Sequence, residues 1–181
     1  MPRKSAAAPG SVRHSGFGSF DAPTIELIWH HDAAGYDALR LIMREYAQSL
    51  SVDLCFQNFE QELAELPGDY AEPRGGLVRA LVNGELAGCC ALRPLDNVDY
   101  PMACEMKRLF VRPQIRGLGL GRQLVEATLD TARRAGYACV LLDTLSDMEA
   151  ARALYEEVGF EEIPPYYHNP IAGAHYLMVR L

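Results

Sequence analysis

The chain has 181 residues, of which 49% are hydrophobic, 23% charged and 9% aromatic, and its formal net charge at pH 7 is −7. This composition suits one ordinary globular domain and excludes wholesale disorder and a disulfide-rich scaffold. Apolar runs, such as residues 138–142, reach about five residues, far fewer than the roughly 20 that span a bilayer. We therefore expect no membrane-spanning segment. The acidic balance disfavours nucleic-acid binding, which relies on clustered Lys and Arg.

The cysteines and the N-terminal segment carry little functional signal. The five cysteines are odd in number and form no C-x-x-C pair. Reduced thiols in a cytoplasmic protein explain them better than zinc ligation, and the histidines show no metal-binding pattern, so we expect no metal. Residues 1–22 are dominated by Ser, Ala, Gly and Pro. We interpret them as a flexible tail, with an organelle transit peptide as the alternative, and residues 23–181 as a single domain.

The remaining chain alternates predicted strands and helices. In chain order, we expect a strand at 24–30, helices at 33–50 and 59–66, strands at 76–82, 85–92 and 102–111, a helix from the turn at 114–121 to Arg134, a strand at 138–143, a helix at 147–158, and short strands at 161–163 and 174–180. Asp32 is a natural N-cap, and the Asn83-Gly84 pair is a strong hairpin signal. Ser146 and Glu149 fit an S-x-x-E capping box.

The glycine-rich turn is the most informative segment. Residues 113–122 have the sequence P-Q-I-R-G-L-G-L-G-R and lie between a predicted strand and a predicted helix. Alternating glycines allow a tight turn and close approach of the backbone to a ligand. Free N–H groups and the dipole at the helix start favour an anion, and Arg116 and Arg122 add positive charge. The turn therefore predicts a phosphate site; the alternative is a turn that binds nothing.

The spacing of the glycines limits which class of phosphate ligand the turn could bind. The pattern is G-x-G-x-G, because position 122 is Arg, so it departs from the dinucleotide pattern G-x-G-x-x-G. It lacks G-K-[ST], which excludes a P-loop. Arg116, Gly119 and Gly121 form R-x-x-G-x-G, which resembles the acyl-CoA pyrophosphate motif of the GNAT superfamily of N-acetyltransferases.

Three further segments agree with this resemblance, which extends over about residues 24–181. Residues 104–111, C-E-M-K-R-L-F-V, resemble the family's fourth strand. Residues 151–160 are similar to its A-x-x-L-Y-E-x-x-G-F helix, and residues 169–176 resemble the loop entering its last strand. The resemblance implies an α+β fold (an αβα sandwich): a mixed, mostly antiparallel, V-splayed sheet of about seven strands flanked by about four helices. It also implies acetyl-CoA as cosubstrate, and it admits a homodimer because similar proteins are often dimers.

The resemblance carries over cofactor-binding residues. Backbone groups of Leu109 and Val111 would hold the pantetheine arm as an added strand would. Many members have Asn seven residues before the helix tyrosine, where this chain has Met148. The implied acetyl-CoA contacts are Leu109, Phe110, Val111, Gln114, Arg116, Gly117, Leu118, Gly119, Leu120, Gly121, Arg122 and Thr144.

Two residues are candidates for proton transfer. Glu105 lies where several family members place a base that deprotonates the amine. The alternative is a strand ion pair, because Glu105 and Lys107 share a face and Lys107 would lower the pKa of Glu105. Tyr155 is the candidate acid that protonates the CoA thiolate; alternatively it is a core residue on the apolar stripe of its helix.

The acceptor implied by the resemblance is a primary amine of a small molecule or peptide. Its binding residues are predicted to be Phe56, Tyr166, Tyr167 and His168, although the last three could equally pack on the neighbouring prolines. The leading hypothesis is therefore an acetyl-CoA-dependent N-acetyltransferase. The alternative is a CoA-binding sensor or partner-binding module without turnover.

Overall fold

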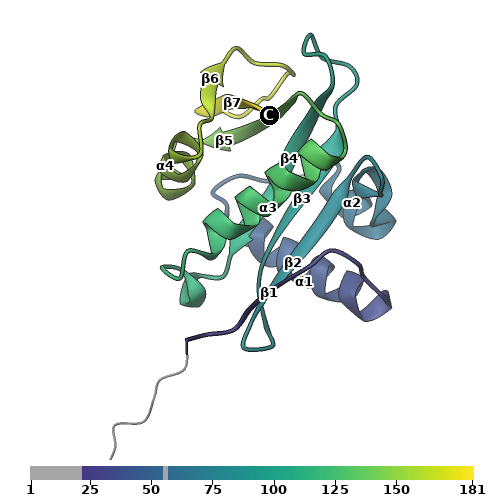
Figure 1. The fold of residues 1–181 in the computed structure, drawn as a ribbon. Coiled ribbons are helices and arrows are strands. Elements are labelled where there is room, and N and C mark those ends of the chain that lie inside the picture. Colours follow the sequence, from purple (N-terminus) through teal and green to yellow (C-terminus); the bar gives the residue numbers. More distant parts are fainter. Residues whose placement is uncertain (1–21, 55–56) are drawn as a thin grey trace, which may run out of the picture.

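The computed structural model describes residues 22–54 and 57–181. Apart from Ala22, the predicted tail lies outside this part, as does Phe56. The elements, shown in Figure 1, are β1 (Ile25–Ile28), α1 (Ala33–Ser49), α2 (Phe59–Glu65), a 3-10 turn (Gly68–Tyr70), β2 (Gly76–Val82), β3 (Glu85–Pro94), β4 (Ala103–Val111), a 3-10 turn (Pro113–Ile115), α3 (Leu120–Arg134), β5 (Cys139–Leu145), α4 (Glu149–Glu157), β6 (Glu161–Ile163) and β7 (Ala174–Arg180).

The strands form one seven-stranded sheet in the order β1-β2-β3-β4-β5-β7-β6. The β4–β5 pair is parallel and the other neighbouring pairs are antiparallel. One apolar cluster packs α3 and Tyr155 of α4 against one face, while α1 and α2 pack against the other. Figure 1 shows α3 and α1 on opposite sides of the sheet. The predicted α+β sandwich with a mixed, mostly antiparallel sheet is confirmed.

Local sequence signals explain several boundaries. The Asp32 side chain accepts a hydrogen bond of 2.8 Å from the Gly35 N–H, which caps α1 as predicted. Asn83 and Gly84 take φ values of 51° and 81°, the left-handed conformation of a tight hairpin turn. The predicted hairpin is confirmed.

The predicted capping box at the last helix is wrong. Helix α4 begins after Met148, without a side-chain cap. Ser146 instead lies beside the start of β7, where its hydroxyl donates to the Gly173 carbonyl at 3.1 Å and contacts His175 at 2.9 Å. The hydroxyl is thus committed to the pairing of neighbouring strands, which the local pattern does not reveal.

The sheet opens between β4 and β5. These strands pair only through three residues each, from Ala103↔Cys139 to Glu105↔Leu141. Beyond Glu105 they diverge, and β4 contains a bulge opposite β3 at which Arg108 has a φ of 60°. The predicted V-shaped splay is therefore present. Within the part of the chain that the structure describes, no helix has the length and apolar content to cross a bilayer.

Candidate functional site

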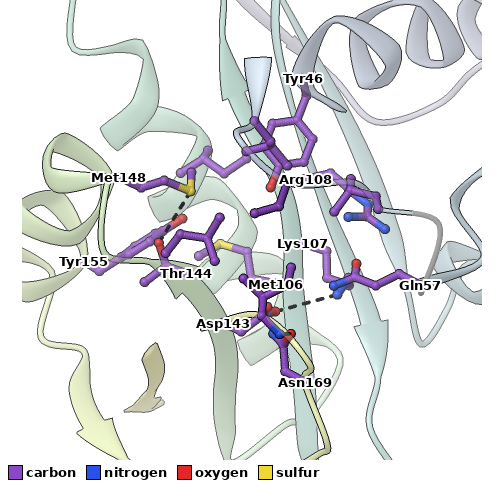
Figure 2. A pocket seen from close by; sticks show the side chains of 16 residues that line it. Tyr46, Gln57, Met106, Lys107, Arg108, Asp143, Thr144, Met148, Tyr155 and Asn169 are labelled. Carbon is purple, nitrogen blue, oxygen red and sulfur yellow. Dashed lines mark hydrogen bonds and ion pairs between the residues drawn. The ribbon is translucent and has the colours of Figure 1, made fainter. Parts of the chain in front are cut away.

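A cleft opens where β4 and β5 diverge, and we call it the strand cleft (Figure 2). Its walls come from β4, β5, α1, α4 and the loop after β6. The lining residues are Tyr46, Leu50, Val52, Leu54, Gln57, Met106, Lys107, Arg108, Leu109, Asp143, Thr144, Leu145, Met148, Tyr155, Asn169 and Ile171. Beside this cleft, residues 106–111 of β4 pair with β3 on one side, but on the side that faces β5 they have no partner strand among the described residues. An extended ligand could therefore lie along β4.

The glycine turn, residues 116–122, precedes α3. Gly117 and Gly119 have φ values of 90° and 74°, and a Cβ atom added at either would meet nothing within 4 Å. Gly119 is the N-cap of α3 and provides no side-chain cap. Among the described residues, the N–H groups of 117–122 have no acceptor. The turn therefore presents several free N–H groups at the positive end of a helix, as an anion site requires.

The two arginines of the turn are already engaged. Arg116 is exposed, and its Nε donates to the Val111 carbonyl at 3.1 Å, which ties the turn to the end of β4. Arg122 pairs with Glu157 and lies 3.6 Å from Glu126. Its charge is thus shared with two surface carboxylates.

Tyr155 lies on α4, packs in the core at 5.5 Å from the Phe160 ring, and also lines the strand cleft. Figure 2 shows its side chain directed into the cleft. Burial raises the pKa of Tyr155 well above its usual value, so the phenol stays protonated at neutral pH. The hydroxyl has no hydrogen-bond partner among the described residues. Nearby, the Thr144 hydroxyl contacts Met148 Sδ at 3.8 Å.

A second cavity of about 300 Å³ adjoins the strand cleft, and we call it the charged cavity. It is lined by Gln57, Glu62, Arg93, Leu95, Asn97, Val98, Glu105, Lys107, Arg108, Tyr166, Tyr167 and His168. The structure thus brings Glu105 together with the three predicted acceptor-binding residues that it describes. The role of Phe56 stays a prediction, because that residue lies outside the described part.

Glu105 is almost fully buried and heavily partnered. Arg93 donates to it at 2.7 Å, the Tyr166 hydroxyl donates at 2.8 Å, and Lys107 lies 3.8 Å away. Burial raises the pKa of Glu105, but the positive charges of Lys107 and Arg93 outweigh this effect and leave the pKa below its ordinary value. Glu105 is therefore ionised at neutral pH. Its contact with Lys107 matches the ion pair considered from the sequence.

Lys107 bridges the diverging strands. Its Nζ lies 3.8 Å from a carboxylate oxygen of Glu105 on β4 and 3.8 Å from one of Asp143 on β5. Burial lowers the pKa of Lys107 below its ordinary value, and the carboxylates of Glu105 and Asp143 offset this effect only in part. Tyr167 donates to the other oxygen of Asp143 at 2.9 Å. The loop after β6 is thereby fixed to both edges of the splay.

Arg108 anchors the opposite wall of the charged cavity. Its guanidinium donates twice to Glu62, at 2.6 and 2.9 Å, and lies 5.2 Å from the centre of the Phe59 ring. Tyr70 adds a hydrogen bond of 2.8 Å to Glu62. Burial raises the pKa of Glu62, but the bonds from Arg108 more than offset it and lower the pKa.

Sequence reasoning missed several lining residues, namely Glu62, Arg93, Arg108 and, as a site residue, Asp143. One signal was present: β4 carries Glu105, Lys107 and Arg108 within an otherwise apolar strand, and charged residues are rarely buried without a partner or a function. The other residues come from distant segments. Among the described residues, no group of three or more His, Cys, Asp or Glu side chains is placed to hold a metal ion.

Comparison with known proteins gives a consistent result. The profile of the acetyltransferase (GNAT) family matches residues 36–160. An uncharacterized N-acetyltransferase of Schizosaccharomyces pombe is 40% identical over 146 residues, which cover 80% of this chain and 88% of that protein. An acetyltransferase structure from Streptococcus agalactiae has a TM-score of 0.70 at 23% identity, covering 87% of this chain and 98% of that one. A Salmonella typhimurium structure, described as an acetyltransferase with its cofactor acetyl-CoA, has a TM-score of 0.61 at 20% identity and covers 86% and 93%.

Proposed function

Because the chain belongs to the GNAT family of acetyltransferases and is an acetyl-CoA-dependent acyltransferase, we propose that it transfers the acetyl group to a primary amine of a small molecule or peptide by direct attack. The observation that carries this proposal is the combination of three features in and beside the splay. The glycine turn that follows β4 has free N–H groups, residues 106–111 of β4 have no partner strand on the side of β5, and Tyr155 lines the strand cleft.

The residues present fit acetyl-CoA. The free N–H groups of 117–122 suit a diphosphate, and the open space above Gly117 and Gly119 leaves room for it. The β4 edge at Leu109 and Val111 suits the two amides of a pantetheine arm, since an extended chain can add to an unpaired strand edge. Thr144 lies across the cleft on β5. When bound, acetyl-CoA supplies the activated acetyl group.

Glu105 acts in this proposal as the base that receives a proton from the amine, directly or through water. Its low pKa makes it a weak base, but its carboxylate is ionised and lines the charged cavity. Tyr155 donates its proton to the departing sulfur from the other side of the site. The amine proton taken up by Glu105 then restores the Tyr155 phenol through solvent, so the site returns to its starting protonation.

The acceptor occupies the charged cavity in this proposal. A volume of about 300 Å³ accommodates a small amine or the end of a peptide. Tyr166, Tyr167 and His168 form its wall on the side of the last loop. The Tyr166 ring packs at 5.4 Å from both Tyr167 and Tyr176, which gives this wall a defined shape.

A thiol-release assay over a panel of amines tests the proposal. Amino acids, polyamines, aminoglycosides and short peptides are incubated with acetyl-CoA and the enzyme, and the products are identified by mass spectrometry. At least one amine should gain an acetyl group, and Glu105→Gln should slow transfer by roughly 10²-fold at neutral pH. Acetyl-CoA binding without acetylation of any amine would contradict the proposal.

A further inference from the structure

Three residues line both the strand cleft and the charged cavity: Gln57, Lys107 and Arg108. If the acetyl donor lies in the first space and the amine in the second, these residues surround the point where the two react. Arg108 is held by Glu62, which accepts from two of its nitrogen atoms. Gln57 and Lys107, in contrast, both have hydrogen-bonding groups that the protein leaves unused.

Lys107 has its charge balanced but its donors unfilled. Its side chain is only 5% exposed, yet both neighbouring carboxylate oxygens lie 3.8 Å away, beyond hydrogen-bond distance. Among the described residues, no other acceptor reaches Nζ. An ammonium group has three N–H donors, and Lys107 lines both the strand cleft and the charged cavity. A ligand oxygen in either space would accept a hydrogen bond from Nζ.

The choice of lysine at this position supports a specific role. Lys4 and Lys107 are the two lysines of the chain, and its other side chains with a permanent positive charge are all arginines. Lysine differs from arginine in presenting a compact point charge, whereas the guanidinium is broad and planar. A compact charge suits a single small oxygen in a narrow cleft.

Gln57 complements Lys107 with an unfilled acceptor. The Oε1 atom of Gln57 is buried and has no hydrogen-bond partner. Its backbone is fixed by a bond of 2.9 Å from its N–H to the Leu54 carbonyl. Figure 2 shows the Gln57 side chain extending toward Lys107. Leaving a buried acceptor unpaired is unfavourable, so a ligand N–H at this place would stabilise the complex.

We infer that Lys107 stabilises the oxyanion that develops on the acetyl carbonyl, while Gln57 Oε1 accepts an N–H of the attacking amine and orients its lone pair. This inference rests on the proposed function. The nitrogen lone pair forms the bond to the acetyl carbon, and the carbonyl electrons move to the oxygen facing Lys107. When the carbonyl re-forms, the carbon–sulfur bond breaks and its electron pair leaves with sulfur. One amine proton is transferred to Glu105, and sulfur receives a proton from Tyr155.

An infrared measurement tests the Lys107 contact without turnover. Acetyl-CoA labelled with ¹³C at the carbonyl is bound to the enzyme in the absence of amine, and the isotope-edited stretch is compared with that in water. A charged donor polarises the carbonyl, so the wild-type band should move to lower frequency. Lys107→Met and Lys107→Gln should both abolish most of that movement. Unfolding curves establish that each variant is folded, and the Gln variant retains a polar, uncharged side chain should the Met variant unfold.

Kinetics test both residues with an amine found by the panel. Lys107→Met should lower kcat by about 10²–10³-fold with nearly unchanged acetyl-CoA affinity. Gln57→Leu should lower kcat/KM for the amine by about tenfold, equivalent to one lost hydrogen bond. Arg133→Met and Gln61→Leu are matched controls, because both side chains are exposed and bond only to Asp130 and Glu65.

The outcomes separate the two proposals. If an amine is acetylated but the Lys107 and Gln57 variants match the controls, the present inference is overturned and the proposed function stands. If no amine is acetylated but the carbonyl band depends on Lys107, the proposed function fails while the contact is supported. An unshifted wild-type band overturns the role of Lys107 in either case.

Discussion

The glycine turn and the charged cavity differ in the groups that they offer to a ligand. The turn presents backbone N–H groups from the six consecutive residues 117–122 at the exposed start of α3. The cavity presents side chains from β3, β4, the segment between α1 and α2, and the loop after β6. Glu105, Lys107 and Arg108 are all buried there, whereas Arg116 at the turn is exposed.

This difference determines which substitutions each region tolerates. Backbone donors do not depend on side-chain identity, so the turn requires only that glycine permit its left-handed conformation. In the cavity, each buried charge depends on its partners, because removing one partner leaves the other as an unpaired charge away from solvent. We therefore expect substitutions in the cavity to damage folding and those in the turn to damage binding.

The largest expected effect is on stability, from breaking a buried ion pair. Arg108→Met should lower the free energy of unfolding by about 3–5 kcal/mol, because Glu62 keeps a buried charge with only Tyr70 as partner. Arg122→Met removes the exposed pair with Glu157 and should cost less than about 1 kcal/mol. Urea unfolding followed by circular dichroism measures both. Equal losses would remove the energetic distinction between the regions.

Tyr155 provides the next largest effect, on catalysis. Tyr155→Phe should lower kcat by about 10²-fold, because the sulfur loses its proton donor, while acetyl-CoA affinity stays nearly constant. Tyr137→Phe is the control: Tyr137 is also a largely buried tyrosine, its hydroxyl donates to the Arg74 carbonyl at 2.7 Å, and it lines neither the strand cleft nor the charged cavity. Steady-state kinetics and calorimetry separate the two quantities. An unchanged kcat in Tyr155→Phe would contradict its role as the proton donor.

The fold was largely predictable because its signals are local. The cap at Asp32, the Asn83-Gly84 turn and the glycine at the start of α3 each act within a few residues. The capping box at Ser146 failed for the opposite reason, since β7, about 30 residues later, takes its hydroxyl. A local pattern cannot report such a competitor.

The candidate site shows the same contrast between local signals and contacts with distant segments. The turn was predicted because its chemistry belongs to one continuous segment. Glu62, Arg93 and Asp143 were not predicted as site residues, because each is positioned by a partner that is distant in sequence. Glu105 illustrates the boundary: its neighbour Lys107 could be foreseen from strand alternation, but the hydrogen bond from Tyr166 could not.

The glycine turn itself yields a smaller effect with a close control. Gly119→Ala should weaken acetyl-CoA binding by about tenfold, because a side chain at a φ of 74° strains the turn and projects into the space left for the ligand. Gly84→Ala has a similar φ of 81° and equally open surroundings, but lies in the β2–β3 hairpin. Both variants should lose about 1 kcal/mol of stability. Calorimetric titration with acetyl-CoA should distinguish them; equal affinities would leave the turn without a role in binding.

The smallest expected effect is on the pH dependence of stability. Lowering the pH should act on the carboxylates of the charged cavity and not on the turn, because residues 113–122 contain no acidic side chain. The pKa of Glu105 lies below its ordinary value of 4.5 in the folded state, so the unfolded chain binds more protons as the pH falls below that value. Stability due to Glu105 is therefore complete above about pH 4.5 and is lost as the pH falls through the folded-state pKa, with a slope of at most about 1.4 kcal/mol per pH unit. Glu105→Gln should flatten this part of the curve, and the exposed Glu161→Gln should not. Unfolding free energies between pH 3 and 6 decide the matter: curves that remain parallel for wild type and Glu105→Gln would mean that the cations around Glu105 do not favour its ionised form.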